Sequence, residues 1–99
     1  MKYELQSTKT FKAWIDSLTN PATLSKVLNR LDRVSNGNFG DHKPLSANLF
    51  ELRFAFGAGI RIYYTIKGRQ VVLLLVGGDK SSQSRDIDKA KAILNTLED

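Results

Sequence analysis

The segment from Leu49 to Lys80 reads LFELRFAFGAGIRIYYTIKGRQVVLLLVGGDK and decides the fold. It contains three apolar runs separated by two glycine-containing breaks, which predicts three antiparallel strands joined in sequence. In the first run apolar side chains occupy every second position from Phe50 to Phe56, so Glu51 and Arg53 point to the opposite face. The second run repeats this alternation and places Arg61 and Tyr63 on that same face. We therefore expect Arg53 and Arg61 side by side on the polar face of one sheet.

Length and composition indicate one soluble domain. The chain has 99 residues, of which 41% are hydrophobic, and this predicts a single domain over residues 1–99 with one core. It has no cysteine, so disulfides and thiolate metal sites are excluded. The N-terminal residues lack an apolar leader, and the longest apolar run, Val71 to Val76, is too short to span a bilayer. These features predict a cytoplasmic protein without a membrane partner.

The charge of the chain points to an anionic partner. The formal net charge is +5, and residues 41–85 hold seven basic against three acidic side chains, whereas residues 86–99 hold two against four. A basic excess concentrated on one part of a domain is typical of contact with phosphate groups. We therefore favour nucleic acid or ribonucleoprotein as the partner over a charge excess that only maintains solubility.

The residues before residue 49 predict a short strand, two helices and a loop. Tyr3 to Gln6 is a candidate strand, and an apolar stripe predicts a helix over residues 10–18 that begins at Ser7 or Thr8 and buries Trp14 in the core. Asn20 and Pro21 mark the start of a second amphipathic helix that ends at Asn36 and Gly37. Residues 38–48 are interpreted as a loop and hold the single histidine, His42.

The end of the chain completes an α+β domain. The strand Val71 to Val76 leads through Gly77 and Gly78 to a helix over residues 85–97, for which Ser84 is the expected cap. The backbone N–H groups at that helix start, beside Lys80, are expected to be able to hold one phosphate. The predicted order is β-α-α-β-β-β-α, a mainly antiparallel sheet with the helices packed on one face.

Several kinds of chemistry are excluded by the residues present. One histidine without a serine and acid at a suitable spacing does not support a nucleophilic triad. No cluster of metal ligands has a recognisable spacing, so we predict neither a metal site nor a cofactor. Glu51 has no acidic partner on its face, which excludes a paired-carboxylate glycosidase.

A set of cations on the polar face remains. Arg53, Arg61 and Lys80 suit metal-free cleavage of a phosphodiester, in which cations hold the phosphate while a base removes the proton of a ribose 2′-hydroxyl. The alternative is that Glu51 pairs with Arg53 or Arg61 as an ordinary surface salt bridge, which contributes little. The pattern alone leaves both interpretations open.

Four segments resemble a known family: residues 40–45 (GDHKPL), 51–53 (ELR), 59–64 (GIRIYY), and 77–80 (GGDK) with Gln83 and Asp86-Ile87. They are similar to the RelE/ParE toxin superfamily, specifically the phage-derived Gp49-like or HigB-like addiction-module killer proteins. The resemblance covers nearly the whole chain and implies the RelE-like fold. It also implies a toxin of a type II toxin-antitoxin system that acts as a ribosome-dependent, metal-independent mRNA endonuclease and blocks translation.

The resemblance implies roles for individual residues. Its basic positions match Arg53, Arg61 and Lys80, and Lys43 matches the basic loop position. The chain lacks the C-terminal tyrosine or histidine that several members use, so His42 or Asp79 is the candidate for proton transfer, with Tyr63 behind it. The residues expected to contact RNA are Lys43, Glu51, Tyr63, Gln83 and Arg85.

Partners follow from the same resemblance. They are a cognate antitoxin, with a helix-turn-helix fold and an adjacent reading frame, and mRNA on the ribosome, and the toxin and antitoxin would form a hetero-oligomer. Two alternatives remain open. One is a ParE-like inhibitor of DNA gyrase without nuclease activity, since a shared fold does not determine activity. The other is an inactive module whose basic face receives an acidic antitoxin segment.

Overall fold

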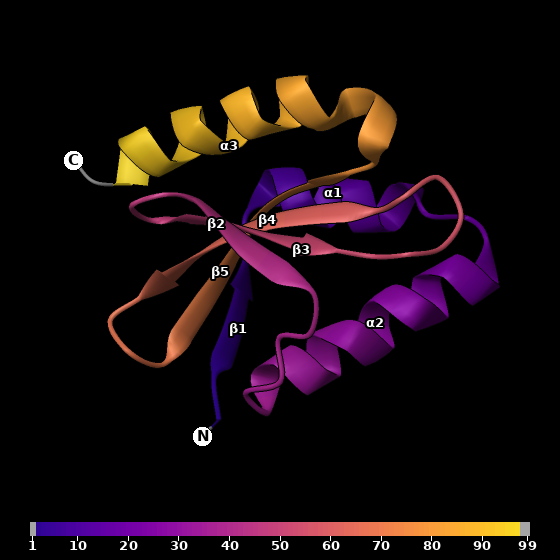
Figure 1. Cartoon of the computed structure of the whole chain (residues 1–99), viewed down its shortest axis with the longest axis horizontal. Helices are drawn as coiled ribbons and strands as arrows, with labels where there is room; N and C mark the ends of the chain where they lie inside the picture. The colour runs from indigo at the N-terminus through magenta and orange to yellow at the C-terminus, as the bar shows by residue number, and fades with distance from the viewer. Residues whose placement is uncertain (1, 98–99) are drawn as a thin grey trace.

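The computed structural model describes residues 2–97, which form three layers, with helices on both faces of one sheet (Figure 1). The elements are β1 (Glu4–Ser7), α1 (Lys9–Ser17), α2 (Pro21–Ser35), β2 (His42–Ser46), β3 (Leu49–Arg53), β4 (Arg61–Lys67), β5 (Val71–Gly78), the short 3₁₀ helix η1 (Lys80–Ser82) and α3 (Gln83–Leu97). The strands form one sheet in the order β1-β5-β4-β3-β2. Only β1 and β5 are parallel, and the other pairs are antiparallel. This confirms the predicted α+β class and the β3-β4-β5 meander.

The first two helices begin where their capping residues predict. The Thr8 side chain accepts a hydrogen bond from the Phe11 N–H at the start of α1, and Asn20 accepts from the N–H groups of Ala22 and Thr23 at the start of α2. Gly37 follows α2 with a φ of 91°, a conformation that glycine adopts without a steric penalty.

The segment expected to be a loop contains a strand. His42–Ser46 forms β2 and pairs antiparallel with β3, so the expectation of an irregular loop over residues 38–48 is wrong. The strand lies at the edge of the sheet, where Pro44 is tolerated because one side of the backbone has no strand to bond. Four of its five residues are exposed, so it lacks the apolar alternation by which a strand is recognised.

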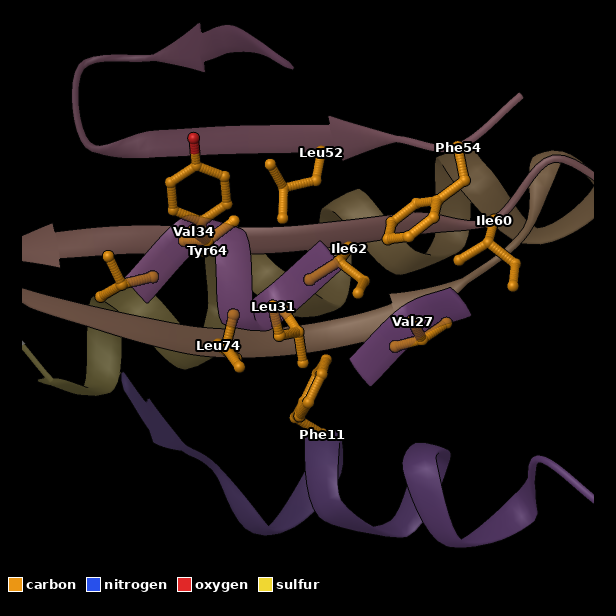
Figure 2. Close-up of a cluster of buried hydrophobic side chains, with 11 residues drawn as sticks. Phe11, Val27, Leu31, Val34, Leu52, Phe54, Ile60, Ile62, Tyr64 and Leu74 are labelled. Carbon is orange, nitrogen blue, oxygen red and sulfur yellow. The ribbon is translucent and has the colours of Figure 1, made fainter. Parts of the chain in front are cut away.

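The helices cover both faces of the sheet. On one face, α1 and α2 bury a cluster that includes Phe11, Leu31 and Ile62 (Figure 2). On the other face, α3 packs through Ala90 against a second cluster that includes Tyr63. The expectation that all helices pack on one face is therefore wrong for α3. The inner strand β5 contributes to both clusters, which explains why its sequence is continuously apolar.

The start of α3 also differs from the expectation. Asp79 caps η1 by accepting a hydrogen bond from the Ser81 N–H, and α3 continues directly from Gln83. Ser84 therefore lies inside the helix and is not its cap. No helix within residues 2–97 has the length and apolar character needed to cross a membrane.

Replacing Ile62 by alanine tests the main core. Ile62 is 0% exposed, so we expect Ile62→Ala to lower the free energy of unfolding by about 2 to 5 kcal/mol, because it leaves a cavity. Leu28→Ala is the control, since Leu28 is 49% exposed and its loss should change stability by about 0.5 kcal/mol or less. Urea denaturation measures both, and equal effects would contradict the described core.

A pH dependence of stability follows from Tyr64, which lies in the same cluster. Burial raises the pKa of Tyr64 to about 12, whereas an unfolded chain has a tyrosine pKa of about 10. The folded state thus keeps the proton more strongly, so this contribution is complete below about pH 10 and is lost as the pH rises to about 12. We expect a steeper loss of stability over this interval in the wild type than in Tyr64→Phe, and equal slopes in urea denaturation would contradict it.

Candidate functional site

A cleft of about 490 Å³ lies where the β3–β4 loop meets the residues that follow β5. Its charged lining consists of Asp41, Arg53, Arg61 and Lys80, and the remaining wall is formed by residues 54–59. The cleft therefore brings together the three cations that the sequence singled out. It adds one carboxylate, Asp41, that the sequence analysis did not select.

Arg53 and Arg61 lie side by side, as the alternation predicted. Their Cα atoms are partners in the β3–β4 ladder. Arg61 is 9% exposed, and its Nη1 donates to the carbonyl oxygens of Gly59 and Ile60, both at 3.1 Å. Because carbonyl oxygens carry no formal charge, these bonds orient Arg61 without neutralising it. Arg61 thus supplies a fixed positive charge to the floor of the cleft.

Arg53 is held by Asp41 instead. Its Nη2 and Nε lie 3.0 and 3.3 Å from Asp41 Oδ1, and this is the one ion pair within 4.0 Å among residues 2–97. Both side chains are substantially exposed, so the pair contributes little to stability. The second carboxylate oxygen, Oδ2, makes no hydrogen bond to the described residues.

The Lys80 side chain packs against Gly59 at the edge of the cleft. A Cβ atom at Gly59 would lie 2.9 Å from Lys80 Cγ, and Gly59 has a φ of 76°. Both the close approach and the backbone conformation require glycine at this position. The Lys80 N–H also donates to the Ala58 carbonyl at 3.4 Å, which connects the start of η1 to the β3–β4 loop.

Arg30 of α2 connects the backbone segments beside the cleft. Its guanidinium donates to the carbonyl oxygens of Phe39, Asp41 and Arg53 at 2.8 to 3.2 Å. The bonds connect α2, the residues before β2 and the end of β3, and thereby place Asp41 beside Arg53. Burial, followed by the nearby charge of Arg33, lowers the pKa of Arg30 below its ordinary value. Arg30 is thus a positioning residue that sequence analysis missed.

Two residues expected to contact RNA are buried under α3. Glu51 and Tyr63 are both 0% exposed, and Glu51 accepts a hydrogen bond from Gln83 Nε2 at 2.8 Å. Burial, together with the neighbouring Glu51 carboxylate, raises the pKa of Tyr63 well above its ordinary value. Glu51 and Tyr63 are therefore not accessible to RNA in this conformation, whereas Gln83 is only partly buried and its expected RNA contact stays a prediction. The alternative salt bridge of Glu51 with Arg53 or Arg61 is not formed either.

The other predicted contacts lie outside the cleft. His42 pairs with Leu52 across β2 and β3, so its side chain points to the face of α1 and α2, opposite to Arg53. Its Nδ1 lies 2.9 Å from the Gly40 carbonyl, and its ring packs on Phe39. Lys43 and Arg85 are exposed but do not line the cleft. The hypothesis that His42 is the base at the arginines is therefore not supported.

Asp79 stabilises the start of η1 as its capping residue. Its Oδ1 accepts hydrogen bonds from the hydroxyl and the N–H of Ser81, and these bonds lower the pKa of the Asp79 carboxyl below its ordinary value. A lower pKa makes a carboxylate a weaker base. The N–H groups of Ser81, Ser82 and Gln83 are also bonded already, so these three are not free to hold a phosphate. Among residues 2–97, no group of three or more acidic or histidine side chains is placed to hold a metal ion.

Arg30 offers a test of this geometry. We expect Arg30→Gln to free the segment that carries Asp41, because a neutral amide cannot bridge three carbonyl oxygens. The free energy of unfolding should fall by about 2 to 4 kcal/mol, since several partly buried carbonyl oxygens lose charged donors. The exposed neighbour Arg33→Gln is the control. Urea denaturation measures both variants, and equal stabilities would show that the three bonds do not hold the segment.

Comparisons with known proteins agree with this architecture. The family described as Phage derived protein Gp49-like (DUF891) matches residues 13–96. An uncharacterized protein from Haemophilus influenzae is 39% identical over 97 residues, which are 98% of this chain and 98% of the relative.

Two solved structures share the fold. A variant of the Escherichia coli toxin RelE, in the free state, gives a TM-score of 0.74 at 15% identity and covers 93% of this chain and 97% of that one. The toxin-antitoxin complex RelBE2 from Mycobacterium tuberculosis gives a TM-score of 0.67 at 22% identity and covers 81% and 100%. Together with the match over residues 13–96, these findings show that the chain belongs to the phage-derived Gp49-like family and has the RelE fold.

Proposed function

We propose that this protein is the toxin of a toxin-antitoxin pair and cleaves mRNA on the ribosome. The observation that carries the proposal is the convergence of Arg53, Arg61 and Lys80 on one cleft. Such a set of cations is suited to bind a phosphodiester and to stabilise the additional negative charge of its transition state. The RelE fold supports the toxin class, because the two structures with that fold are a toxin and a toxin-antitoxin complex.

Binding of the scissile phosphate is assigned to the arginines. Arg61 is fixed by carbonyl oxygens at the floor of the cleft, so its charge needs little rearrangement when the phosphate arrives. Arg53 is the more exposed partner and can bind a second phosphate oxygen. Lys80 lines the cleft beside Gly59, and we assign to its ammonium group the stabilisation of the departing oxygen.

Proton transfer is assigned to Asp41, which is the one carboxylate lining the cleft. The ribose 2′ oxygen forms a bond to phosphorus while its proton passes to Asp41 Oδ2. The bond from phosphorus to the 5′ oxygen breaks, and the Lys80 ammonium group gives that oxygen a proton. The products are a 2′,3′-cyclic phosphate and a 5′-hydroxyl end. This role replaces the hypotheses for His42 and Asp79, because neither side chain lines the cleft.

The partners proposed for this function are an antitoxin and the translating ribosome. The RelBE2 structure is a toxin-antitoxin complex, which supports an antitoxin as the regulatory partner of this chain. We propose that the antitoxin is encoded beside this chain and contains a helix-turn-helix domain. The basic charge of the chain, +5, favours association with the phosphate-rich surface of the ribosome.

Cleavage of a translated mRNA tests the proposal. With purified ribosomes and primer extension, we expect the wild type to cut and Arg61→Ala to cut about 10² to 10³ times more slowly, because it loses a cation at the transition state. Asp41→Asn should also be slowed, by about 10²-fold or more, since an amide cannot accept the proton. Lys89→Ala and His42→Ala are controls outside the cleft and should cut at the wild-type rate.

Three outcomes would contradict the proposal or a part of it. Intact mRNA with the wild-type protein would exclude the nuclease, and DNA gyrase inhibition by the same preparation would then identify the ParE-like alternative. Equal cleavage by Arg61→Ala and wild type would exclude this cleft as the site. If His42→Ala rather than Asp41→Asn abolished cleavage, the proton acceptor would be His42.

A further inference from the structure

A second cleft adjoins the first. It has a volume of about 360 Å³ and shares Asp41 and residues 54–56 with the candidate site. Its opposite wall is the outer face of α2, which contributes Lys26, Asn29, Arg30 and Arg33. The two clefts therefore adjoin along this shared lining, and their lining residues extend from Lys80, across the β3–β4 loop, to α2.

The second cleft is basic and its charge is not balanced. Lys26 and Arg33 are exposed and form no ion pair with the described residues. Asp41 is the one carboxylate in the lining of either cleft, and it is bound to Arg53. Arg30 is occupied by three carbonyl oxygens, so it adds positive potential but offers few free donors. The two free cations of this cleft are thus Lys26 and Arg33.

The position of Lys26 is fixed by the loop that separates the clefts. Its Nζ lies over the ring of Phe56, 4.4 Å from the ring centre. A cation held in this way by an aromatic ring keeps its charge and loses less side-chain freedom when an anion binds. Phe56 lines both clefts, so it places the Lys26 ammonium group at the junction between them.

The spacing along α2 suits an extended chain of anions. Residues 26, 29 and 33 follow each other at intervals of three and four residues, so they share one face of the helix. The first and the last are separated by about 10 Å along the helix axis, from a rise of about 1.5 Å per residue. The cations are thus placed to contact successive phosphates, and Asn29 between them offers an amide to a base or a sugar.

We propose that this second cleft is a subsite for single-stranded RNA beside the scissile phosphate. This proposal rests on the proposed function and extends that function to the nucleotides that flank the scissile phosphate, whose own phosphates contact Lys26 and Arg33. RNA fits better than an acidic peptide because the second cleft adjoins a cleft with the cations and the base that phosphodiester cleavage requires. The substrate is thus held over several nucleotides and not at the scissile phosphate alone.

Direct binding of short RNAs tests the subsite without the ribosome. The probes are a fluorescent trinucleotide and decanucleotide with 2′-O-methyl groups, which prevent cleavage, and anisotropy measures their affinity. We expect the wild type to bind the decanucleotide more tightly than the trinucleotide. Lys26→Ala combined with Arg33→Ala should weaken decanucleotide binding about tenfold or more and leave trinucleotide binding unchanged. The slope of log K against log salt should fall by about 1.4, since two single-strand phosphate contacts are lost.

A matched control removes the same charge elsewhere. Lys89 and Lys91 of α3 are exposed and line neither cleft, so Lys89→Ala combined with Lys91→Ala should stay within about twofold of the wild type. Equal losses in the two double variants would refute the subsite, because net charge alone would then explain binding. A wild type that binds both probes equally, or a decaglutamate peptide that competes as well as the decanucleotide, would also refute it.

These outcomes are separate from those of the proposed function. The proposed function fails if ribosomal mRNA remains intact, whatever the anisotropy shows. The subsite fails if the α2 variant binds like the control, even when Arg61→Ala abolishes cleavage. Thermal unfolding is the control for folding. If both double variants unfold at the same temperature as the wild type, the substitutions act on binding and not on folding.

Discussion

The hydrogen bonds of Arg30 are the interaction on which the candidate site depends. Its guanidinium reaches three backbone carbonyls from two segments that are far apart in sequence, and Gly40, whose φ is +66°, leaves the space that it occupies. A Cβ atom at Gly40 would lie 3.1 Å from the guanidinium nitrogens. A planar group with five donors suits such a junction, and a lysine ammonium does not have this geometry. Asp41 stands beside Arg53 because this junction fixes the backbone on both sides.

The sequence predicts the parts of the fold that depend on local signals, and Arg30 is an example of a part that it does not predict. Strand alternation, Thr8 and Asn20 as caps, and Gly37 after α2 are local signals, so each predicted its element correctly. β2 has no apolar alternation and exists because β3 offers it an edge, which is not a local property. Arg30 lies on α2, and its carbonyl partners belong to other segments that become its neighbours only after folding.

Most differences between the predicted and the observed site concern the polar face of the sheet. Glu51, Arg53, Arg61 and Tyr63 do share a face, as the period of two predicted, but α3 covers half of it. In the half that α3 covers, Glu51 accepts a hydrogen bond from Gln83. At the uncovered end, the two arginines line the cleft. Periodicity assigns residues to a face, and it does not say whether a distant helix covers that face. Asp41 lies beside Arg53 only because β2 pairs with β3, and the sequence carries no local signal for β2.

The way in which the cations are held supports an anionic ligand. Arg30 and Arg61 bond to carbonyl oxygens, which fix the guanidinium groups and leave their formal charges in place. A protein that needed arginine only for stability would gain more from carboxylate partners, because a buried charge without a counterion is costly. Here the compensating negative charge is absent from the lining of the cleft except for Asp41. An anion that enters the cleft therefore meets fixed positive charges with little reorganisation, which is the condition that makes electrostatic stabilisation effective in catalysis.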